Sequence, residues 1–337
     1  MKVLIVGEYS GVGAGLKFGF DQLGIHCDHI KTPDGYKNIG NSLKKKSALM
    51  SHILMCLSAL EKSLRFKYDL AIFLSPFVFN RPLYINKMLN SLIINSSNKN
   101  ILLCCTSDSV WWNDWPEKNI RSPRIGALLD RGFKLHPFCS PNFYDYNISF
   151  AEKMDKVFTL GACYSIAYSN TEFNTVKIHY PLVPPIINKT EKEIDFYHGI
   201  TRPGMKGSEL IKSLINKVSQ KHPKAQIKIT TKVDFQEYES ILDHTKVYFD
   251  QIYSYGPGMS SLSALYRVPL VATGIKSAPG YEKYISDCPC VDILDNLDNL
   301  ESFVFKGDYK TAMKNNRDFI HKYHDPVKVV KSILDEF

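Results

Sequence analysis

The sequence lacks the features that mark a membrane-spanning or secreted protein. No uninterrupted apolar stretch approaches the roughly 20 residues needed to cross a bilayer. The first apolar run, residues 3–6, is too short for the core of a secretory signal and predicts a strand instead. None of the eight cysteines has the Cys-x-x-Cys spacing of a zinc or redox site, and we expect no metal site, even at Cys288-Pro289-Cys290. We therefore expect reduced cysteines in a cytoplasmic protein, soluble or peripheral at a membrane.

Two common nucleotide-binding motifs are also incomplete. Residues 7–15 are rich in glycine, but a dinucleotide fingerprint started at Gly11 or Gly13 lacks its third glycine. No Gly-Lys-Ser/Thr ending of a Walker motif follows, which excludes P-loop chemistry. A glycine-rich turn between a strand and a helix can still present backbone N–H groups to an anion or a sugar. Two interpretations stay open: a ligand-facing loop at Ser10, Gly11 and Gly13, and a tight structural turn.

Length and composition favour two globular domains. The 337 residues are too many for one typical domain, and 44% apolar residues are enough for two cores. The net charge of +8 suits anionic partners such as nucleotide diphosphates or an acidic membrane surface. The basic residues are dispersed and no nucleic-acid-binding module occurs, so we expect no nucleic-acid partner.

Short apolar runs alternate with helix-like segments in both halves of the chain. This alternation is typical of α/β proteins whose parallel sheets are covered on both faces. Helices are expected at about residues 16–23 and 208–220. The expected strands are residues 3–6, 70–74, 101–105, 156–160, 194–198, 226–229, 246–249 and 268–272.

A proline-rich segment marks the boundary between the halves. Pro181, Pro184 and Pro185 exclude regular helix, and the polar residues after them lead into a new strand. We expect a first domain over residues 1–183 and a second over residues 191–320. Residues 321–337 should form a C-terminal helix that packs back on the first domain.

Polar segments follow two expected strands of the second half. The first segment holds Arg202, a planar fork of donors, and Lys206, a mobile point charge, which together suit a diphosphate. The alternative is that both are solvated loop cations. The second, residues 250–258, leads through Gly-Pro-Gly into a short helix, whose first amides and the hydroxyls of Ser260 and Ser261 would form an anion cradle.

Together these segments resemble the sugar-nucleotide transferases of the GT-B fold, especially the retaining bacterial capsule and O-antigen enzymes (family four type, group 1). In that family a strand, loop and helix with Arg and Lys-Gly follow the interdomain linker, as Arg202 and Lys206-Gly207 do here. Many bacterial members then carry Asp-Gln, a Gly-rich turn, a Glu-Ala-Met-Ala helix and Gly-x-Pro-Val-Val-Ala-Thr. The residues that match in order and spacing are Asp250-Gln251, Gly256, Gly258, Ser263-Ala264-Leu265 and Val268-Pro269-Leu270-Val271-Ala272-Thr273. The resemblance covers residues 194–275 well and the first 30 residues loosely.

The resemblance implies two Rossmann-like domains facing each other across a cleft, with an acceptor side in the first and the donor site in the second. It implies a hexosyltransferase that moves a sugar from a UDP- or GDP-sugar to a glycan or lipid-linked acceptor in surface polysaccharide biosynthesis. Neither a cofactor nor a metal is implied. The implied donor-binding residues are Arg202, Lys206, Asp250, Gln251, Gly256, Gly258, Met259, Ser260, Ser261 and Ser263.

Two positions depart from the family pattern. The family carries two glutamates eight positions apart, one near the donor sugar and one bonding the nucleotide ribose, where this chain has Tyr255 and Ser263. Either the donor site is rebuilt or catalysis is lost. The alternatives are therefore a catalytically inactive GT-B-like binding subunit and a sugar-nucleotide epimerase on the same scaffold.

Two carboxylates of the first half are candidates for activating an acceptor. Glu8 and Asp108 each follow an expected strand, and ligands bind at the carboxyl ends of strands in open α/β sheets. The alternative for each is a helix cap or a loop ion pair. His136 and His198 are the substitutes as general base. A sugar platform and an ordinary core role are both open for the nearby tryptophans, Trp111, Trp112 and Trp115.

Residues 41–67 predict a basic amphipathic helix. Its apolar residues recur at helical spacing, and its cations include Lys44, Lys45, Lys46, Lys62, Arg65 and Lys67. One interpretation is a domain helix with a solvated basic face. The other is peripheral contact with the acidic inner surface of a membrane.

Overall fold

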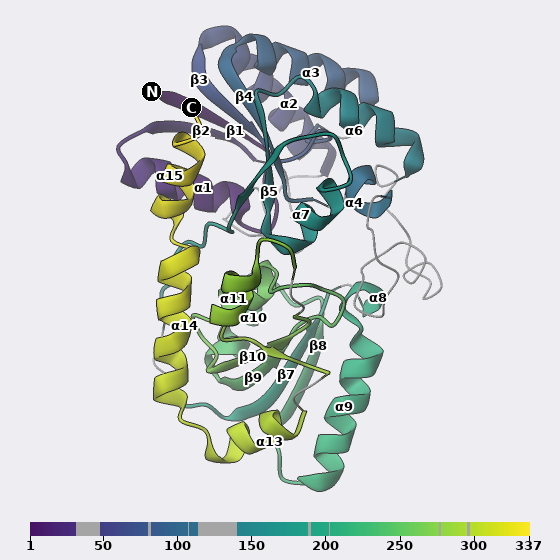
Figure 1. Ribbon diagram of the computed structural model, residues 1–337, viewed down its shortest axis with the longest axis vertical. Helices are drawn as coiled ribbons and strands as arrows, with labels where there is room; N and C mark the ends of the chain where they lie inside the picture. Colours follow the sequence, from purple (N-terminus) through teal and green to yellow (C-terminus); the bar gives the residue numbers. More distant parts are fainter. Residues whose placement is uncertain are drawn as a thin grey trace. The chain divides into compact units, whose positions relative to one another are not determined.

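The computed structural model describes residues 1–31, 48–79, 82–106, 108–113, 140–187, 190–201, 203–275, 278–294 and 297–337. These residues divide into two compact units (Figure 1). The first unit holds the described residues up to Val183 together with His324–Phe337, and the second holds those within Pro184–Tyr323. The functional roles expected of the two units, acceptor side and donor side, remain predictions.

A six-stranded parallel sheet forms the centre of the first unit. Its strand order is β2-β1-β3-β4-β5-β6. The apolar residues of β1 are fully buried, as expected for a strand with neighbours on both edges and helices on both faces. The strands are β1 (Lys2–Val6), β2 (His26–Ile30), β3 (Tyr68–Phe73), β4 (Ser97–Cys104), β5 (Lys156–Leu160) and β6 (Thr175–Ile178).

Helices cover both faces of this sheet. The chain moves from β1 to β2 in one direction and then returns past β1 to β3, so right-handed crossovers place α1 on one face and α2 on the other. The contacts agree, since α1 packs against α15 and α2 packs against α3 (Figure 1). The elements are α1 (Val12–Gln22), α2 (Ala48–Arg65), α3 (Leu83–Asn95), α4 (Ser109–Asn113), a 3₁₀ turn (Pro141–Phe143), α6 (Tyr144–Ala151), α7 (Gly161–Tyr168) and α15 (Pro326–Leu334).

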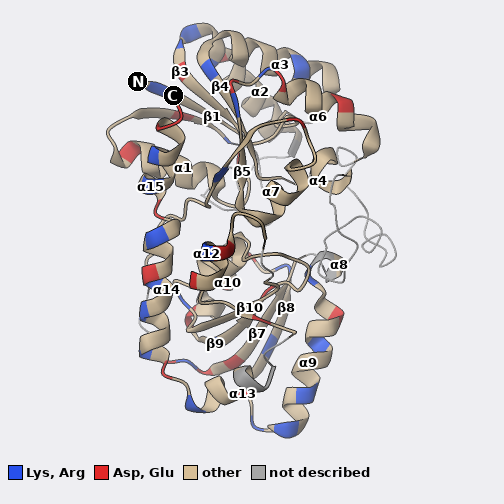
Figure 2. Ribbon diagram, viewed as in Figure 1, with Lys and Arg blue, Asp and Glu red and all other residues tan. Residues whose placement is uncertain are grey.

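The second unit is built around a five-stranded parallel sheet of order β11-β10-β9-β7-β8. Its strands are β7 (Ile194–Ile200), β8 (Ile227–Thr231), β9 (Thr245–Phe249), β10 (Leu270–Thr273) and β11 (Val291–Asp292). Its helices are α8 (Pro203–Lys206), α9 (Ser208–Lys221), α10 (Phe235–Asp243), α11 (Met259–Ala264), α12 (Glu282–Asp287), α13 (Leu297–Lys306) and α14 (Tyr309–Tyr323). Figure 2 shows Lys and Arg spread along α9 and α14 rather than gathered over one of them.

The sequence expectations for these elements are largely confirmed. All eight expected strands occur, and the helices expected at residues 16–23 and 208–220 are α1 and α9. In α9 the buried stripe consists of Ile211, Ile215 and Val218, and Leu210 is 40% exposed. Three strands were not expected, namely β2, β6 and β11.

The glycines after β1 are explained partly by backbone conformation and partly by close packing. Gly7 and Gly11 have φ angles of 108° and 90°, a left-handed region that favours glycine. A Cβ atom on Gly15 would lie 2.1 Å from the carbonyl oxygen of Pro181, and one on Gly19 would lie 2.4 Å from that of Pro326. Glycine therefore lets α1 approach the interdomain linker and α15 more closely than any other residue could.

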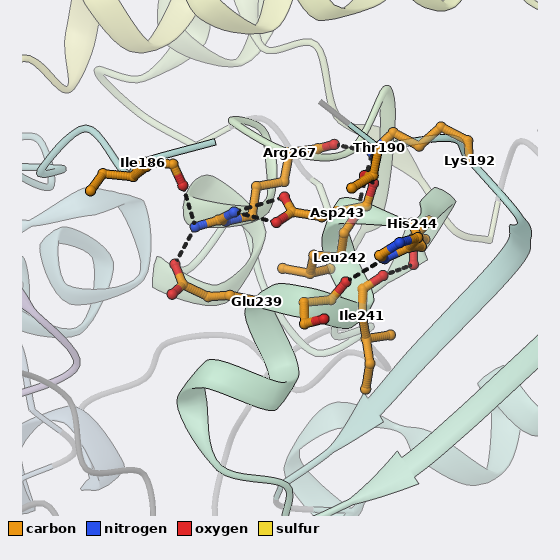
Figure 3. A network of polar contacts seen from close by, with 11 residues as sticks. Ile186, Thr190, Lys192, Glu239, Ile241, Leu242, Asp243, His244 and Arg267 are labelled. Carbon is orange, nitrogen blue, oxygen red and sulfur yellow. Dashed lines mark hydrogen bonds and ion pairs between the residues drawn. The ribbon is translucent and has the colours of Figure 1, made fainter. Parts of the chain in front are cut away.

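The linker is anchored to both units. On the first unit, the Leu182 amide donates to the carbonyl oxygen of His324. On the second, Arg267 donates to Asp243 at 2.7 and 2.9 Å, to Glu239 at 2.7 Å and to the carbonyl oxygen of Ile186 at 3.3 Å (Figure 3).

None of the described helices is long and apolar enough to cross a membrane. The described part of the expected basic helix, from residue 48 onwards, is helical and forms α2. Lys44, Lys45 and Lys46 lie outside the described residues.

Of the histidine side chains in the described part of the chain, three are almost completely buried: His29, His198 and His324. Burial disfavours the charged imidazolium and lowers the pKa of His29 and of His198 to about 4, and that of His324 to about 3. Each is therefore neutral in the folded protein near neutral pH.

These histidines predict a loss of stability in acid. Because their pKa values are lower in the folded than in the unfolded state, the unfolded chain binds more protons as the pH falls from 6.5 towards 4. We expect these three histidines, together with His179, whose pKa burial also lowers to about 4, to add about four protons to the uptake on unfolding near pH 5 compared with pH 8, seen as a fall in the denaturant midpoint. His198→Asn should lower this uptake by about one proton. An unfolding midpoint that stays level from pH 7 to pH 4.5 would contradict the assignment.

Close packing of α1 on α15 predicts an unusual effect of a glycine substitution. Gly→Ala within a helix normally stabilises by about 0.8–1 kcal/mol. We expect Gly19→Ala to destabilise the first unit by about 1–3 kcal/mol, because the new methyl group meets the backbone of Pro326. Gly256→Ala is the control, since a Cβ there lies 3.6 Å from Ile285, an ordinary contact. Urea titration measures both, and a Gly19→Ala protein more stable than wild type would exclude the packing.

Candidate functional site

The second sheet reverses its direction of growth beside β7. From β7 the chain goes first to β8 on one side and then to β9 on the other. The loops that follow β7 and β9 diverge at such a point, and open α/β sheets bind ligands there, outside the carboxyl ends of the strands. Residues 201–207 and 250–258 are these two loops.

A buried ion pair connects the two loops. Asp250, which follows β9, is 1% exposed, and its Oδ1 atom accepts a hydrogen bond of 2.7 Å from Nζ of Lys206. Its Oδ2 atom accepts one of 2.6 Å from the hydroxyl of Ser261 in α11. Burial acts to raise the pKa of Asp250, but the Lys206 charge and these hydrogen bonds hold it below its usual value. One carboxylate thus ties α8, β9 and α11 together.

The Lys206 side chain is buried and held by hydrogen bonds, unlike a solvated loop cation. Its side chain is 5% exposed, and Nζ also donates to the carbonyl oxygen of Gly199 at 3.1 Å. An ammonium group has three donors, so two of the three are used within the protein. Any contact of Lys206 with a ligand therefore involves the remaining N–H.

The short helix α11 begins at the expected cradle. Gly258 is its N-cap and has no side chain to accept from the first-turn amides. Within the described structure, the amides of Met259, Ser260 and Ser261 donate to no protein acceptor, as is usual for a first helical turn. Met259 and Ser260 are half-buried. These amides are available to an anion, whereas the Ser261 hydroxyl is already used by Asp250.

Two other expected donor-site residues, Gln251 and Gly256, form hydrogen bonds that stabilise the loop after β9. The carbonyl oxygen of Gln251 accepts from the amide of Gly274 and from the hydroxyl of Thr273 at 3.0 Å. Gly256 is buried and its carbonyl oxygen accepts from Ser254. Arg202 lies outside the described residues.

The two positions that depart from the family pattern present no acidic group. Tyr255 is 2% exposed. The hydroxyl of Ser263 donates to the carbonyl oxygen of Ser260 at 3.2 Å, within its own helix.

Glu8 caps a helix in the first unit. Its side chain is 6% exposed, and its oxygens accept from the amides of Gly11 at 2.9 Å and Ala14 at 2.8 Å, at the start of α1. Burial raises the pKa of Glu8, although these amides act to lower it. A Cβ on Gly13 would lie 2.6 Å from Nε2 of His29, so Gly13 is needed for packing, while Ser10 is exposed.

Asp108 has a similar place at the start of α4. One oxygen accepts from the amide of Trp111 at 2.8 Å, and the other accepts from the hydroxyl of Tyr168 at 2.7 Å. Trp111 and Trp112 are 5% and 2% exposed and pack edge to face, which is a core role and excludes an open sugar platform in this structure. Trp115 and His136 lie outside the described residues.

His198 is fully buried, and both ring nitrogens have protein partners. Nδ1 lies 2.9 Å from the carbonyl oxygen of Phe249, and Nε2 lies 3.0 Å from the hydroxyl of Ser208. It links β7 to β9 and to the start of α9, so its role here is structural.

The sequence analysis missed Tyr248, whose hydroxyl lies 3.3 Å from Oδ1 of Asp250. The available signal was its spacing, because residues two apart on a strand share one face. The described residues contain no group of His, Cys, Asp and Glu side chains that could hold a metal ion, and none of the seven described cysteines is in a disulfide.

Comparison with known proteins identifies the fold. No protein-family model and no curated protein matches the sequence. Sucrose-phosphate synthase from Thermosynechococcus elongatus aligns with 99% of this chain and 98% of its own, with a TM-score of 0.55 and 9% identity. An apo structure of OtsA aligns over 99% and 98%, with a TM-score of 0.51 and 10% identity. The chain has the GT-B fold.

S. aureus TarM, solved as a variant with fondaparinux, α-GlcNAc-glycerol and UDP, has a TM-score of 0.53 and 13% identity to this chain. The alignment covers 83% of this chain and 58% of TarM, so the chain spans less than two thirds of TarM's length. At these identities the shared feature is the GT-B architecture of two Rossmann-like domains.

The buried ion pair predicts strong coupling between its partners. Lys206→Met should leave Asp250 charged and uncompensated, and destabilise the second unit by about 3–5 kcal/mol. The double variant Lys206→Met with Asp250→Asn should recover most of this loss, because no isolated charge remains. Chemical unfolding of both single variants and the double variant completes the cycle. Single-variant losses that simply add would show that the two side chains do not interact.

Proposed function

We propose that the chain is a glycosyltransferase that moves a sugar from a UDP- or GDP-sugar to a glycan or lipid-linked acceptor. The observation that carries the proposal is the site at the carboxyl ends of β7 and β9, where Lys206, Asp250 and Ser261 connect two loops beneath the first turn of α11. The GT-B fold and the UDP present in the TarM structure support a nucleotide-sugar donor. Surface polysaccharide biosynthesis remains the proposed pathway.

The described residues suit stabilisation of a departing diphosphate. As the glycosidic bond breaks, negative charge builds up on the leaving group. The amides at the start of α11 and the remaining N–H of Lys206 are donors held in place before the reaction begins. A preorganised donor of this kind contributes about 3–4 kcal/mol in the transition state. Asp250 is a positioning residue, since it fixes Lys206 and α11 relative to each other.

In the proposal, Glu8 and Asp108 are the candidates for activating the acceptor in the first unit. Burial raises the pKa of Glu8, the direction that a general base needs. Both carboxylates also bind helix amides, so a substitution changes the fold as well as the chemistry. Glu8→Gln keeps one of the two acceptor oxygens at the cap and the shape of the side chain, so it is the variant for assays of transfer.

A second candidate function is a catalytically inactive binding subunit. It is favoured by Tyr255 and Ser263, neither of which supplies a carboxylate where the family has one. Incubation with a panel of UDP- and GDP-sugars separates the alternatives. Binding with slow hydrolysis supports a transferase, and binding alone supports a binding subunit. Release of the nucleotide with a free aminosugar indicates an epimerase.

A charge placed at the start of α11 tests the donor site. Ser260→Asp favours the helix, because a negative side chain in the first turn stabilises by about 0.3–1 kcal/mol. The same charge should repel a diphosphate and weaken UDP or GDP binding on the order of tenfold or more. Calorimetry measures the affinity, and the neutral Ser260→Asn is the matched control. Equal affinity of the Asp and Asn variants would remove α11 from the donor site.

A further inference from the structure

Helix α2 exposes large apolar side chains on the face opposite the one that packs inward. Ser51 and Ala59 are 4% and 0% exposed, and with Met55 they form the face that packs inward. The opposite face carries five large apolar residues, which we call the α2 apolar face. At about 100° of turn per residue they fall within an arc of about 100°. They are Leu49 (70% exposed), Met50 (48%), Ile53 (42%), Leu57 (55%) and Leu64 (70%).

Helix α3, which neighbours α2, also exposes large apolar side chains. α3 packs against α2, and its Tyr84 and Met88, one turn apart, are 71% and 52% exposed. Single exposed apolar residues are common on soluble proteins, whereas a group of this size on adjacent helices marks an interaction surface.

The charge of the surrounding sequence indicates what the surface binds. Residues 31–67 contain eight Lys or Arg and two Asp or Glu, a net charge of +6 out of +8 for the whole chain. Among the described residues of this segment, Arg65 and Lys67 are exposed at the end of α2, where Arg65 forms a solvent-exposed ion pair with Glu61 and Lys67 donates to the carbonyl oxygen of Asn95. Lys and Arg beside an apolar helical face are typical of helices that lie in the interface of an acidic bilayer. An apolar groove on a protein partner does not require such a concentration of positive charge.

We propose that the α2 apolar face docks on a bilayer of acidic phospholipids. The side chains of Leu49, Ile53 and Leu57 enter the boundary between headgroups and acyl chains, while Arg65 and Lys67 contact anionic headgroups. The helix lies parallel to the membrane and does not cross it. This surface is separate from the residues assigned to sugar transfer, so the inference stands whether or not the chain is a transferase.

Vesicle binding by the full chain tests the proposal. The probes are phosphatidylcholine vesicles with and without about one-third phosphatidylglycerol, in flotation assays at about 0.15 M and 1 M salt. We expect binding to the acidic vesicles at low salt, and loss of binding on neutral vesicles or at high salt. The triple variant Leu49→Ser, Ile53→Ser, Leu57→Ser should bind at least about tenfold more weakly. All three side chains are exposed, so the variant should keep its fold.

Two further variants sharpen the result. Leu210→Ser with Phe305→Ser removes exposed apolar side chains from the second unit, where they are 40% and 48% exposed, and should bind like wild type. Arg65→Gln with Lys67→Gln should lose about fivefold in affinity per charge. Wild-type and triple-variant chains that bind acidic vesicles equally would overturn the proposal. So would an absence of vesicle binding together with a wild-type dimer that the triple variant abolishes, because a second copy would then be the occupant.

Discussion

The buried pair of Asp250 and Lys206 is the contact on which the candidate site depends. Two opposite charges removed from water are stable together and costly apart, so each side chain holds the other in place. Through Ser261 the same carboxylate also fixes the first turn of α11. The open amides at the start of α11 are therefore held against the loop that carries Lys206. These contacts fix the geometry of the candidate site without a ligand, which is what the proposed stabilisation of a leaving group would require.

In the first unit, buried carboxylates also accept hydrogen bonds at the starts of helices, but here they cap the helices. In this unit α1 follows β1 and α4 follows β4 after a short turn, and the first amides of a helix need acceptors. Glu8 meets this need for α1, and Asp108 meets it for α4. Position at the carboxyl end of a strand thus identifies a functional candidate and a helix cap equally well. The sequence alone could not separate them, since both roles use a carboxylate at the same place.

The strands that the sequence did not predict lie at the edges of the two sheets. β1, β3 and β9 have neighbours on both edges and were all predicted, whereas three of the four edge strands, β2, β6 and β11, were not, and only the fourth, β8, was. Edge strands are less buried and carry polar residues, as His26 and Asp28 show in β2. Their pairing is decided by the neighbouring strand rather than by their own composition. The glycines of α1 were likewise ambiguous until Pro181 and α15 were placed beside them.

The sequence by itself determined the α/β class, the two-part organisation and the segments that surround β7 and β9, because burial and turn chemistry leave local patterns. Only the tertiary structure decided which polar groups remain available to a ligand. Lys206, Asp250 and His198 are paired with residues up to 51 positions away, which no local pattern records. The exposure of the α2 apolar face could also be recognised only in the tertiary structure. An apolar helix shows its hydrophobicity in the sequence, but whether the rest of the chain covers it depends on how its neighbours pack.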